Sequence, residues 1–219
     1  MISISYAITV CNEYNEFVNL INHLLQYINM SEDEIVVLHD ESKSDDRIIE
    51  FAQSHSNYHN IKFITDKFDK HFANWKNKFK NLCSKEYVFQ IDADEIPNQF
   101  LLENIKTILF SNPGIELYWI PRENYVNGIT EQHIKEWSWT IDDLGRINFP
   151  DYQARLFKNN PNIKWQNPVH EIIVGAVSQA TLPAESRFSL LHNKTIDKQE
   201  KQNTLYSTCL LYTSDAADE

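Results

Sequence analysis

The chain has 219 residues, of which 42% are hydrophobic and 23% are charged, and this composition excludes a disordered or fibrous protein. At ~150 residues per domain, the length predicts a single domain with its own core. The formal net charge of -11 at pH 7 argues against nucleic acid as a partner, because nucleic-acid binding depends on clustered Lys and Arg side chains that neutralise phosphates.

In the first half of the chain, short apolar runs alternate with segments whose apolar residues recur every three or four positions. The runs predict buried strands at residues 4–10, 34–38, 61–64 and 87–91. The spaced segments predict amphipathic helices at residues 17–28, 47–54, 72–82 and 98–110. This order predicts an α/β fold with a doubly wound, mostly parallel sheet, whose function lies at the carboxyl ends of the strands.

The second half contains strand-like pieces separated by turns, followed by one helical pattern. Strands are predicted at residues 117–121, 153–158 and 169–174, and a helix at residues 195–206. No linker or internal repeat separates the two halves, so we expect them to share one sheet in one domain.

Glycine and cysteine usage restricts the kinds of site. The chain has only four glycines, the first at Gly114, which excludes the glycine-rich loops that cradle phosphates in Walker and dinucleotide-binding folds. A nucleotide would therefore need a metal ion at its phosphates. The three cysteines form no CxxC pair, so neither a disulfide framework nor a zinc site is expected.

Nothing in the pattern predicts insertion into a membrane. No apolar run approaches the ~18 residues of a membrane span, and the first ten residues lack the features of a signal peptide. We expect a cytoplasmic protein with reduced thiols.

The last eleven residues, 209–219, show no apolar period and resemble the translation of a transposase-type sequencing adapter. We therefore expect residues 1–208 to form the domain and residues 209–219 to be non-native, with the natural chain continuing past Thr208. The alternative is an ordinary frayed terminus.

Three carboxylates, those of Asp92, Asp94 and Glu95, directly follow the fourth apolar strand. In extended backbone Asp92 and Asp94 would point the same way, and their like charges would then call for a cation. Carboxylate oxygens select Mg²⁺ or Mn²⁺, which bind one or two carboxylates together with substrate phosphates. The alternative is a helix N-terminus, whose dipole favours acidic side chains; it accounts for Glu95 but poorly for Asp92.

Two other strand ends also carry polar side chains. Asp40 follows the second strand, where it would accept hydrogen bonds from a nucleoside, or else close a turn or cap a helix. Thr9, Asn12 and Glu13 lie where the first strand ends, and Asn12 is an equally good helix cap.

Together these segments resemble family 2 glycosyltransferases, which have the nucleotide-sugar-binding GT-A fold. The opening strand and Asn-Glu turn match residues 8–13, the acid-rich segment matches residues 36–46, and the Asp-x-Asp motif matches residues 92–94. Arg155-Leu156-Phe157, Val169-His170-Glu171 and His192 resemble signatures of a bacterial subgroup. The resemblance covers roughly residues 3–206. Glu41 departs from it, because a glycine is usual there.

The resemblance implies a nucleotide-diphosphate sugar as donor and Mn²⁺ or Mg²⁺ as cofactor, since a divalent cation stabilises the leaving diphosphate. Asp94, helped by Asp92, would hold the cation, and His192 or its competitor His170 would complete the metal site.

The resemblance further assigns Asp40 to the nucleoside, and Thr9, Asn12 and Glu13 to the wall of the same pocket. Arg155 would contact a phosphate, or equally would pair with Asp151.

Family 2 enzymes invert the anomeric carbon and need a carboxylate that deprotonates the acceptor hydroxyl. The resemblance assigns this base to Glu171, with Asp151 as the reserve candidate. The implied acceptor is a glycan or a lipid-linked molecule in cell-envelope synthesis, at the inner face of the cell membrane. Peripheral membrane association would involve a C-terminal region beyond this chain.

Two other functions stay open at this point. One is a metal-dependent phosphohydrolase or nucleotidyltransferase, which also uses clustered carboxylates beside a sheet. The other is a catalytically silent carbohydrate-binding protein on the same scaffold. Four tryptophans in the second half would stack on an acceptor sugar, but most of them are expected to be core residues: Trp119, Trp137, Trp139 and Trp165.

Overall fold

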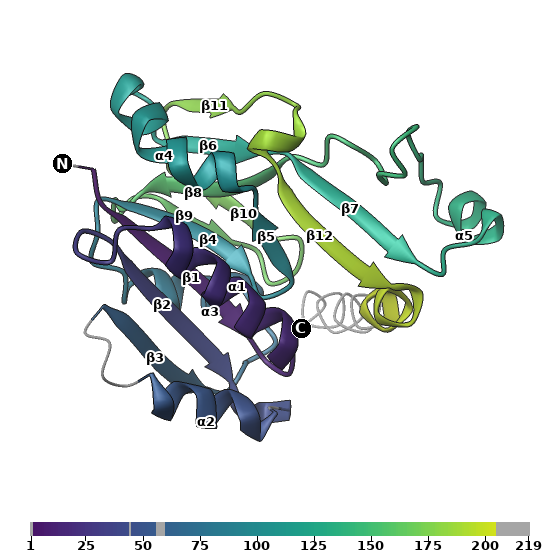
Figure 1. Cartoon of the computed structure of the whole chain (residues 1–219), viewed down its shortest axis with the longest axis horizontal. Coiled ribbons are helices and arrows are strands. Elements are labelled where there is room, and N and C mark those ends of the chain that lie inside the picture. The colour runs from purple at the N-terminus through teal and green to yellow at the C-terminus, as the bar shows by residue number, and fades with distance from the viewer. Residues whose placement is uncertain (1, 44, 56–59, 205–219) are drawn as a thin grey trace, which may run out of the picture.

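The computed structural model describes residues 2–43, 45–55 and 60–204. In this part of the chain the central sheet has seven strands (Figure 1). The four strands of the first half pair in parallel, whereas β8 runs antiparallel to both of its neighbours. The strand order is β11 (Gln179–Thr181), β6 (Leu117–Ile120), β8 (Gln153–Lys158), β4 (Tyr87–Asp92), β1 (Ile4–Val10), β2 (Glu34–Asp40) and β3 (Ile61–Asp66).

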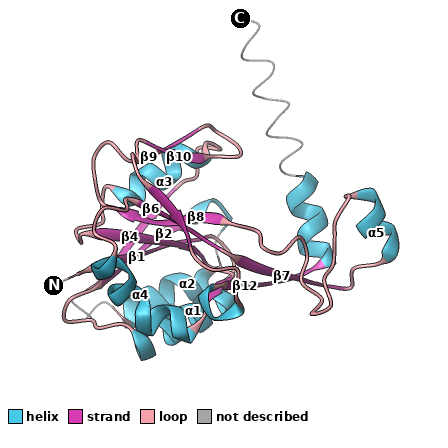
Figure 2. Cartoon of the chain, turned by 90° about the horizontal axis from the view of Figure 1, so that it is seen from above, coloured by secondary structure: helices cyan, strands magenta, loops and turns pink. Residues whose placement is uncertain are grey.

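Helices cover both faces of this sheet (Figure 2). One face carries α1 (Tyr14–Tyr27), α2 (Asp46–Ser54) and α4 (Gln99–Ser111), and the other carries α3 (Phe72–Lys80). Tyr6 and Ile8 of β1 belong to the core cluster that contains Phe17 of α1, whereas Ala7 packs in the cluster that contains Phe79 of α3. Since successive strand side chains point to opposite faces, a strand covered on both sides is apolar throughout, as the sequence predicted.

Local hydrogen bonds set where the helices begin. The side chains of Asp45, His71 and Asn98 each accept a backbone N–H in the first turn of α2, α3 and α4. At α1 the carboxylate of Glu13 instead accepts the backbone N–H groups of Cys11 and Asn12. Asn12 is therefore not the helix cap.

A second sheet places the end of the chain beside the end of β4. Its order is β5 (Glu95–Pro97), β12 (Leu190–Thr195) and β7 (Arg122–Asn127). In this register His192 lies opposite Glu95 on one side and opposite Asn124 on the other. A helix over residues 196–204 follows β12 directly.

A two-stranded hairpin of β9 (Lys164–Gln166) and β10 (Ile172–Val174) packs on α3. The side chain of Asn77 on α3 donates to the carbonyl of Trp165 and accepts from its N–H, both at 2.8 Å. The backbone N–H of Phe72 also donates to the carbonyl of Pro168 at 2.9 Å. These bonds fix the loop that carries Glu171.

The α/β class, the mostly parallel sheet and the elements predicted in the first half are confirmed within a few residues. The second half joins the central sheet through β6, β8 and β11, but it also builds the second sheet, which the sequence did not predict. The short helix α5 (Glu131–Glu136) was not predicted either. Residues 209–219 lie outside the described residues.

Two local predictions were wrong. Ala93 and Asp94 form a turn rather than extended backbone, because the chain reverses there between β4 and β5. The strand predicted at residues 169–174 begins only at Ile172, because Asn167 and His170 have φ angles of 79° and 53°, which end extended structure. Among the described residues, no helix combines the length and apolar character that crossing a bilayer requires.

Candidate active site

A cleft of about 1150 Å³ lies at the carboxyl ends of β1, β2 and β4 and extends to β7, β12 and the β9–β10 hairpin. Asp40, Asp94 and Glu171, which the sequence assigned to three different tasks, all line it. His170 does not: it is exposed and absent from the lining. The other candidates also line it, namely Thr9, Asn12, Glu13, Asp92, Asp151, Arg155 and His192.

Asp40 closes a turn at one end of the cleft. Its carboxylate accepts the backbone N–H groups of Ser42 and Phe68 at 3.0 and 3.1 Å, and the Ser42 hydroxyl at 2.9 Å. Burial works to raise the pKa of Asp40, but these hydrogen bonds outweigh it and hold the pKa below its usual range. Asp40 therefore closes a turn, as one prediction had it, and also lines the cleft, as the other required.

Asp92 is held by neighbours rather than left free for a ligand. Its Oδ2 accepts from the Arg155 guanidinium at 2.5 Å, and its Oδ1 accepts from Gln90 at 2.9 Å and from Thr9 at 3.3 Å. Burial works to raise the pKa of Asp92, yet the charges of Arg155 and then Lys76 hold it well below its usual range. Asp92 stays ionised at neutral pH.

The ion pair between Asp92 and Arg155 continues into a network of five charged side chains, of which Arg155 and Glu95 are buried. Fully buried Glu95 accepts from Arg155 at 2.6 Å and from Arg122 at 2.9 Å, and Arg122 also donates to Asp151 at 2.6 Å. The alternative pairing of Arg155 with Asp151 is wrong, because Arg122 takes that place. Glu95 is an ion-pair partner in β5 and does not serve the N-terminus of α4, which Asn98 caps.

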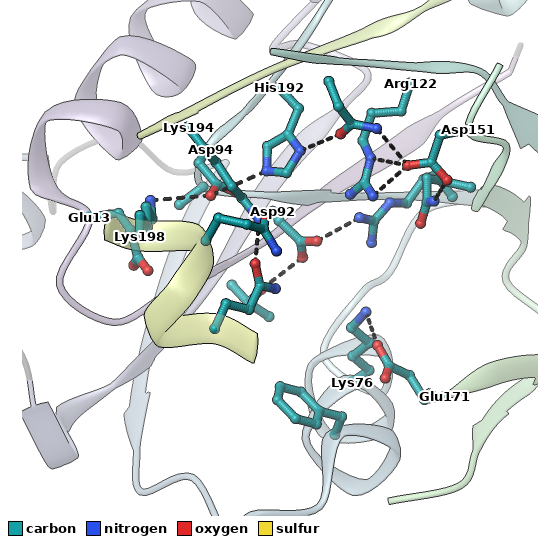
Figure 3. Close-up of a pocket in the computed structure, with 18 of the residues that line it drawn as sticks. Glu13, Lys76, Asp92, Asp94, Arg122, Asp151, Glu171, His192, Lys194 and Lys198 are labelled. Carbon is teal, nitrogen blue, oxygen red and sulfur yellow. Dashed lines mark hydrogen bonds and ion pairs between the residues drawn. The ribbon is translucent and has the colours of Figure 1, made fainter. Parts of the chain in front are cut away.

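Asp94 faces a different set of side chains (Figure 3). Its Oδ2 lies 3.4 Å from Nε2 of His192 and 3.2 Å from Nζ of Lys198. Burial works to raise the pKa of Asp94, but the hydrogen bond and charge of His192, followed by the charges of Lys198 and Lys194, hold it far below its usual range.

A hydrogen-bonded chain orients His192. Asp151 can only accept, so the Asn124 amide turns its NH₂ to Asp151 at 2.8 Å and its oxygen to Nδ1 of His192 at 2.7 Å. Nδ1 therefore donates to Asn124, and Nε2, which faces Asp94, carries a proton when the ring is charged and a lone pair when the ring is neutral. A carboxylate oxygen and a nitrogen lone pair that face each other need a proton or a cation between them.

This donor pair fits a divalent cation. Among the residues described, no group of three or more His, Cys, Asp and Glu side chains converges. Mg²⁺, however, commonly uses only one or two protein ligands and completes its shell with phosphate oxygens and water. Asp94 and His192 would be the two protein ligands of such an ion, and a phosphate group in the cleft would supply others.

Glu171 lies apart from Asp94 and His192 across the cleft (Figure 3). Lys76 is only 7% exposed, and its ammonium donates to Oε1 of Glu171 at 2.5 Å and lies 4.4 Å from the ring centroid of Trp165. No described residue donates to Oε2 of Glu171. By contrast, Asp151 accepts from Arg122, Asn124 and Gln153.

The model for glycosyl transferase family 2 matches residues 5–172 of the sequence. The chain belongs to this family. No curated protein matches the sequence.

Among solved structures, this family 2 chain is similar to TarS 1-349 of S. aureus. The complex of TarS with UDP-GlcNAc has a TM-score of 0.63 at 16% identity, over 88% of this chain and 59% of that chain. The complex of TarS 1-349 with UDP has a TM-score of 0.61 at 16% identity, over 96% of this chain and 66% of that chain. At this identity the likeness establishes the GT-A fold, and this chain spans 60% of the length of TarS 1-349.

Several cleft residues of this family 2 chain were not singled out from the sequence. The sequence pattern could have singled out Lys76, because it lies between Phe72, Trp75 and Phe79 on the apolar face of its helix. A lysine in that position needs a partner for its charge. Arg122 and Asn124 gave no such indication, since their partners lie 27 or more residues away in the sequence. Of the tryptophans, Trp165 is buried as expected, whereas Trp119, Trp137 and Trp139 are half-buried.

Replacement of Asn124 by alanine tests the orientation of His192. Without the amide oxygen, the imidazole loses the acceptor that fixes its tautomer, and we expect the dissociation constant for Mn²⁺ to rise ~10- to 100-fold. Calorimetric titration with MnCl₂ measures it. Asn104→Ala on α4, outside the cleft, is the matched control, and equal affinities in the two variants would contradict the role of Asn124.

Proposed function

We propose that this family 2 chain is an inverting glycosyltransferase that moves a sugar from a nucleotide-diphosphate donor to an acceptor hydroxyl with the help of Mn²⁺ or Mg²⁺. The observation that supports this most directly is the shared cleft, which is lined by Asp40, Asp94 and Glu171. These three carboxylates come from segments far apart in the sequence, and each has a different set of partners.

In this proposal the two ends of the cleft bind the two ends of the donor. Asp40 and the Thr9–Glu13 segment bind the nucleoside, since they form one wall of the cleft. Asp94 and His192 hold the divalent cation, which neutralises charge that develops on the diphosphate as it leaves. Asp92 is locked by Arg155, so it contributes negative potential and rigidity beside Asp94 rather than a free ligand oxygen.

Glu171 is the proposed base. The acceptor O–H gives its proton to this carboxylate, the oxygen forms a bond to the anomeric carbon, and the bond from that carbon to the diphosphate breaks with its electron pair on the leaving oxygen. Inversion requires the acceptor and the diphosphate to lie on opposite faces of the sugar. The separation of the Lys76–Glu171 pair from the Asp94–His192 pair supports this arrangement (Figure 3).

Aromatic rings from the second half of the chain also line the cleft. Trp119, Trp139, Trp165 and Tyr152 line it, and aromatic faces stack on sugar rings. We accordingly propose a glycan or lipid-linked acceptor. The family resemblance extends this proposal to cell-envelope synthesis at the cytoplasmic face of the membrane.

Thermal unfolding with UDP-, GDP- and dTDP-sugars, each with and without Mn²⁺, tests the donor class. A donor present at ~100 times its dissociation constant stabilises the folded state by ~2.7 kcal/mol, which corresponds to a rise in the midpoint of about 5–10 °C for a chain of this size. We expect at least one nucleotide sugar to raise the unfolding midpoint by this amount, and the rise to be larger with Mn²⁺ than without it. If none does so, the proposal is wrong; hydrolysis of simple phosphate esters with Mn²⁺ would favour a phosphohydrolase instead.

A further inference from the structure

Two lysines from the end of the described chain lie in the cleft beside the proposed metal ligands. Lys194 lies near the end of β12, two residues after His192, and Lys198 lies in the following helix, residues 196–204. Both side chains are half-buried, and both lie next to Asp94 (Figure 3). Neither residue was singled out from the sequence.

The charge balance of the cleft differs from that of the whole chain. The chain carries 31 acidic and 20 basic side chains, but equal numbers of Asp or Glu and of Lys or Arg line the cleft. Basic side chains are thus concentrated where a ligand would bind. A cleft built only to hold a cation would be expected to carry an excess of carboxylates.

Three of the six basic side chains that line the cleft are paired with buried or half-buried carboxylates other than Asp94. Arg155 has Asp92 and Glu95, Arg122 has Asp151, and Lys76 has Glu171. Lys194 differs, because no carboxylate of a described residue lies within 4.0 Å of its ammonium, which donates to the neutral side chain of Gln202.

Lys198 contacts two carboxylates, those of Asp94 and Glu16. The Asp94 oxygen that it contacts at 3.2 Å is the oxygen that faces Nε2 of His192. A divalent cation on Asp94 and His192 would compete for that oxygen, and the ammonium of Lys198 would then be left with the exposed carboxylate of Glu16, 3.6 Å away. Lys194 and Lys198 therefore place two ammonium groups beside Asp94, one bonded to a neutral amide and the other left with an exposed carboxylate, which contributes little because it is screened by solvent.

We propose that Lys194 and Lys198 bind the diphosphate of the donor, so that the segment after His192 neutralises the leaving group together with the metal ion. This inference rests on the proposed function, and it assigns two residues to the diphosphate of the proposed donor. Positive groups held in place at a leaving diphosphate act where negative charge develops, so they stabilise the transition state more than the ground state. Both residues are in this sense catalytic residues of the transfer.

The test compares binding of a diphosphate with binding of the bare nucleoside. Lys194→Met and Lys198→Met remove the charge but keep the aliphatic stem, and circular dichroism verifies that each variant is folded. Calorimetry measures the affinity for UDP and GDP, and ligand-observed NMR measures that for uridine and guanosine, in Mn²⁺ and again in EDTA. We expect each variant to bind the diphosphate ~10-fold or more weakly, with the nucleoside affinity unchanged, because hydrogen bonds to charged groups are among the strongest in proteins.

Three further variants complete the design. Lys194→Arg and Lys198→Arg retain the charge and should retain most of the diphosphate affinity. Lys135→Ala, an exposed lysine on α5 outside the cleft, should change neither affinity. If Lys198 were only a counter-ion of Asp94, Lys198→Met would shift the unfolding midpoint and the Mn²⁺ affinity but not the ratio of diphosphate to nucleoside affinity.

The possible failures are distinguishable. If the parent chain binds UDP or GDP and both Met variants bind it equally well, the inference is overturned and the proposed function stands. If the parent chain binds no nucleoside diphosphate with or without Mn²⁺, the proposed function and the inference fail together.

Discussion

Asp94→Asn is expected to lower the turnover of a nucleotide sugar ~100- to 1000-fold while the fold survives. The carboxylate is the one charged ligand in the donor pair with His192, and a metal ion contributes several kcal/mol of charge stabilisation at a leaving group. Asparagine has nearly the same shape, so the turn between β4 and β5 can persist. Transfer to an acceptor, or hydrolysis of the donor identified by thermal unfolding, provides the rate.

Two controls separate loss of metal from loss of structure. Asp143→Asn makes the same replacement of a carboxylate by an amide at an exposed residue outside the cleft. It should leave the rate unchanged. EDTA should inactivate the parent chain to a similar extent as the substitution, and excess Mn²⁺ should restore the parent but not Asp94→Asn. Full activity of Asp94→Asn, or of the parent in EDTA, would remove the metal from the mechanism.

Glu171→Gln is expected to lower kcat for sugar transfer ~100- to 10000-fold, the range for loss of a general base, with donor affinity unchanged. Glutamine still accepts a hydrogen bond from Lys76, so the side chain keeps its place but cannot take the acceptor proton. Steady-state rates against acceptor, together with calorimetric donor binding, measure the two effects separately.

Asp151→Asn is the informative comparison for the choice of base. The Asp151 carboxylate is already occupied by Arg122, Asn124 and Gln153, and it anchors the chain of hydrogen bonds that orients His192. Its replacement should therefore reduce stability and Mn²⁺ affinity, because Arg122 loses the charge of its half-buried partner and the Asn124–His192 chain loses its anchor. If Glu171→Gln kept its kcat and Asp151→Asn lost kcat at normal Mn²⁺ affinity, Asp151 would be the base.

The fold was largely predictable because its signals are local. Apolar runs and three-to-four residue spacing depend only on neighbours along the chain, and they located β1 to β4 and their helices within a few residues. The predictions failed at residues 95–97 and 190–195, which are short strands whose pairing partners lie far away in the sequence. A three-residue strand such as β5 has too few positions to show a period.

By itself, the sequence determined the family, the α/β class and the positions of acidic side chains at strand ends, because each depends on residue order alone. Only the tertiary structure decided how those side chains are used. Asp92 and Asp94 are two residues apart, yet one is tied to Arg155 and the other faces His192 and Lys198. The physical reason is that the partners of a charged side chain are set by strand order and register across 60 or more residues. Whether a carboxylate that the sequence predicts to be a ligand is available for binding, or is already paired with a basic side chain, depends on those distant partners.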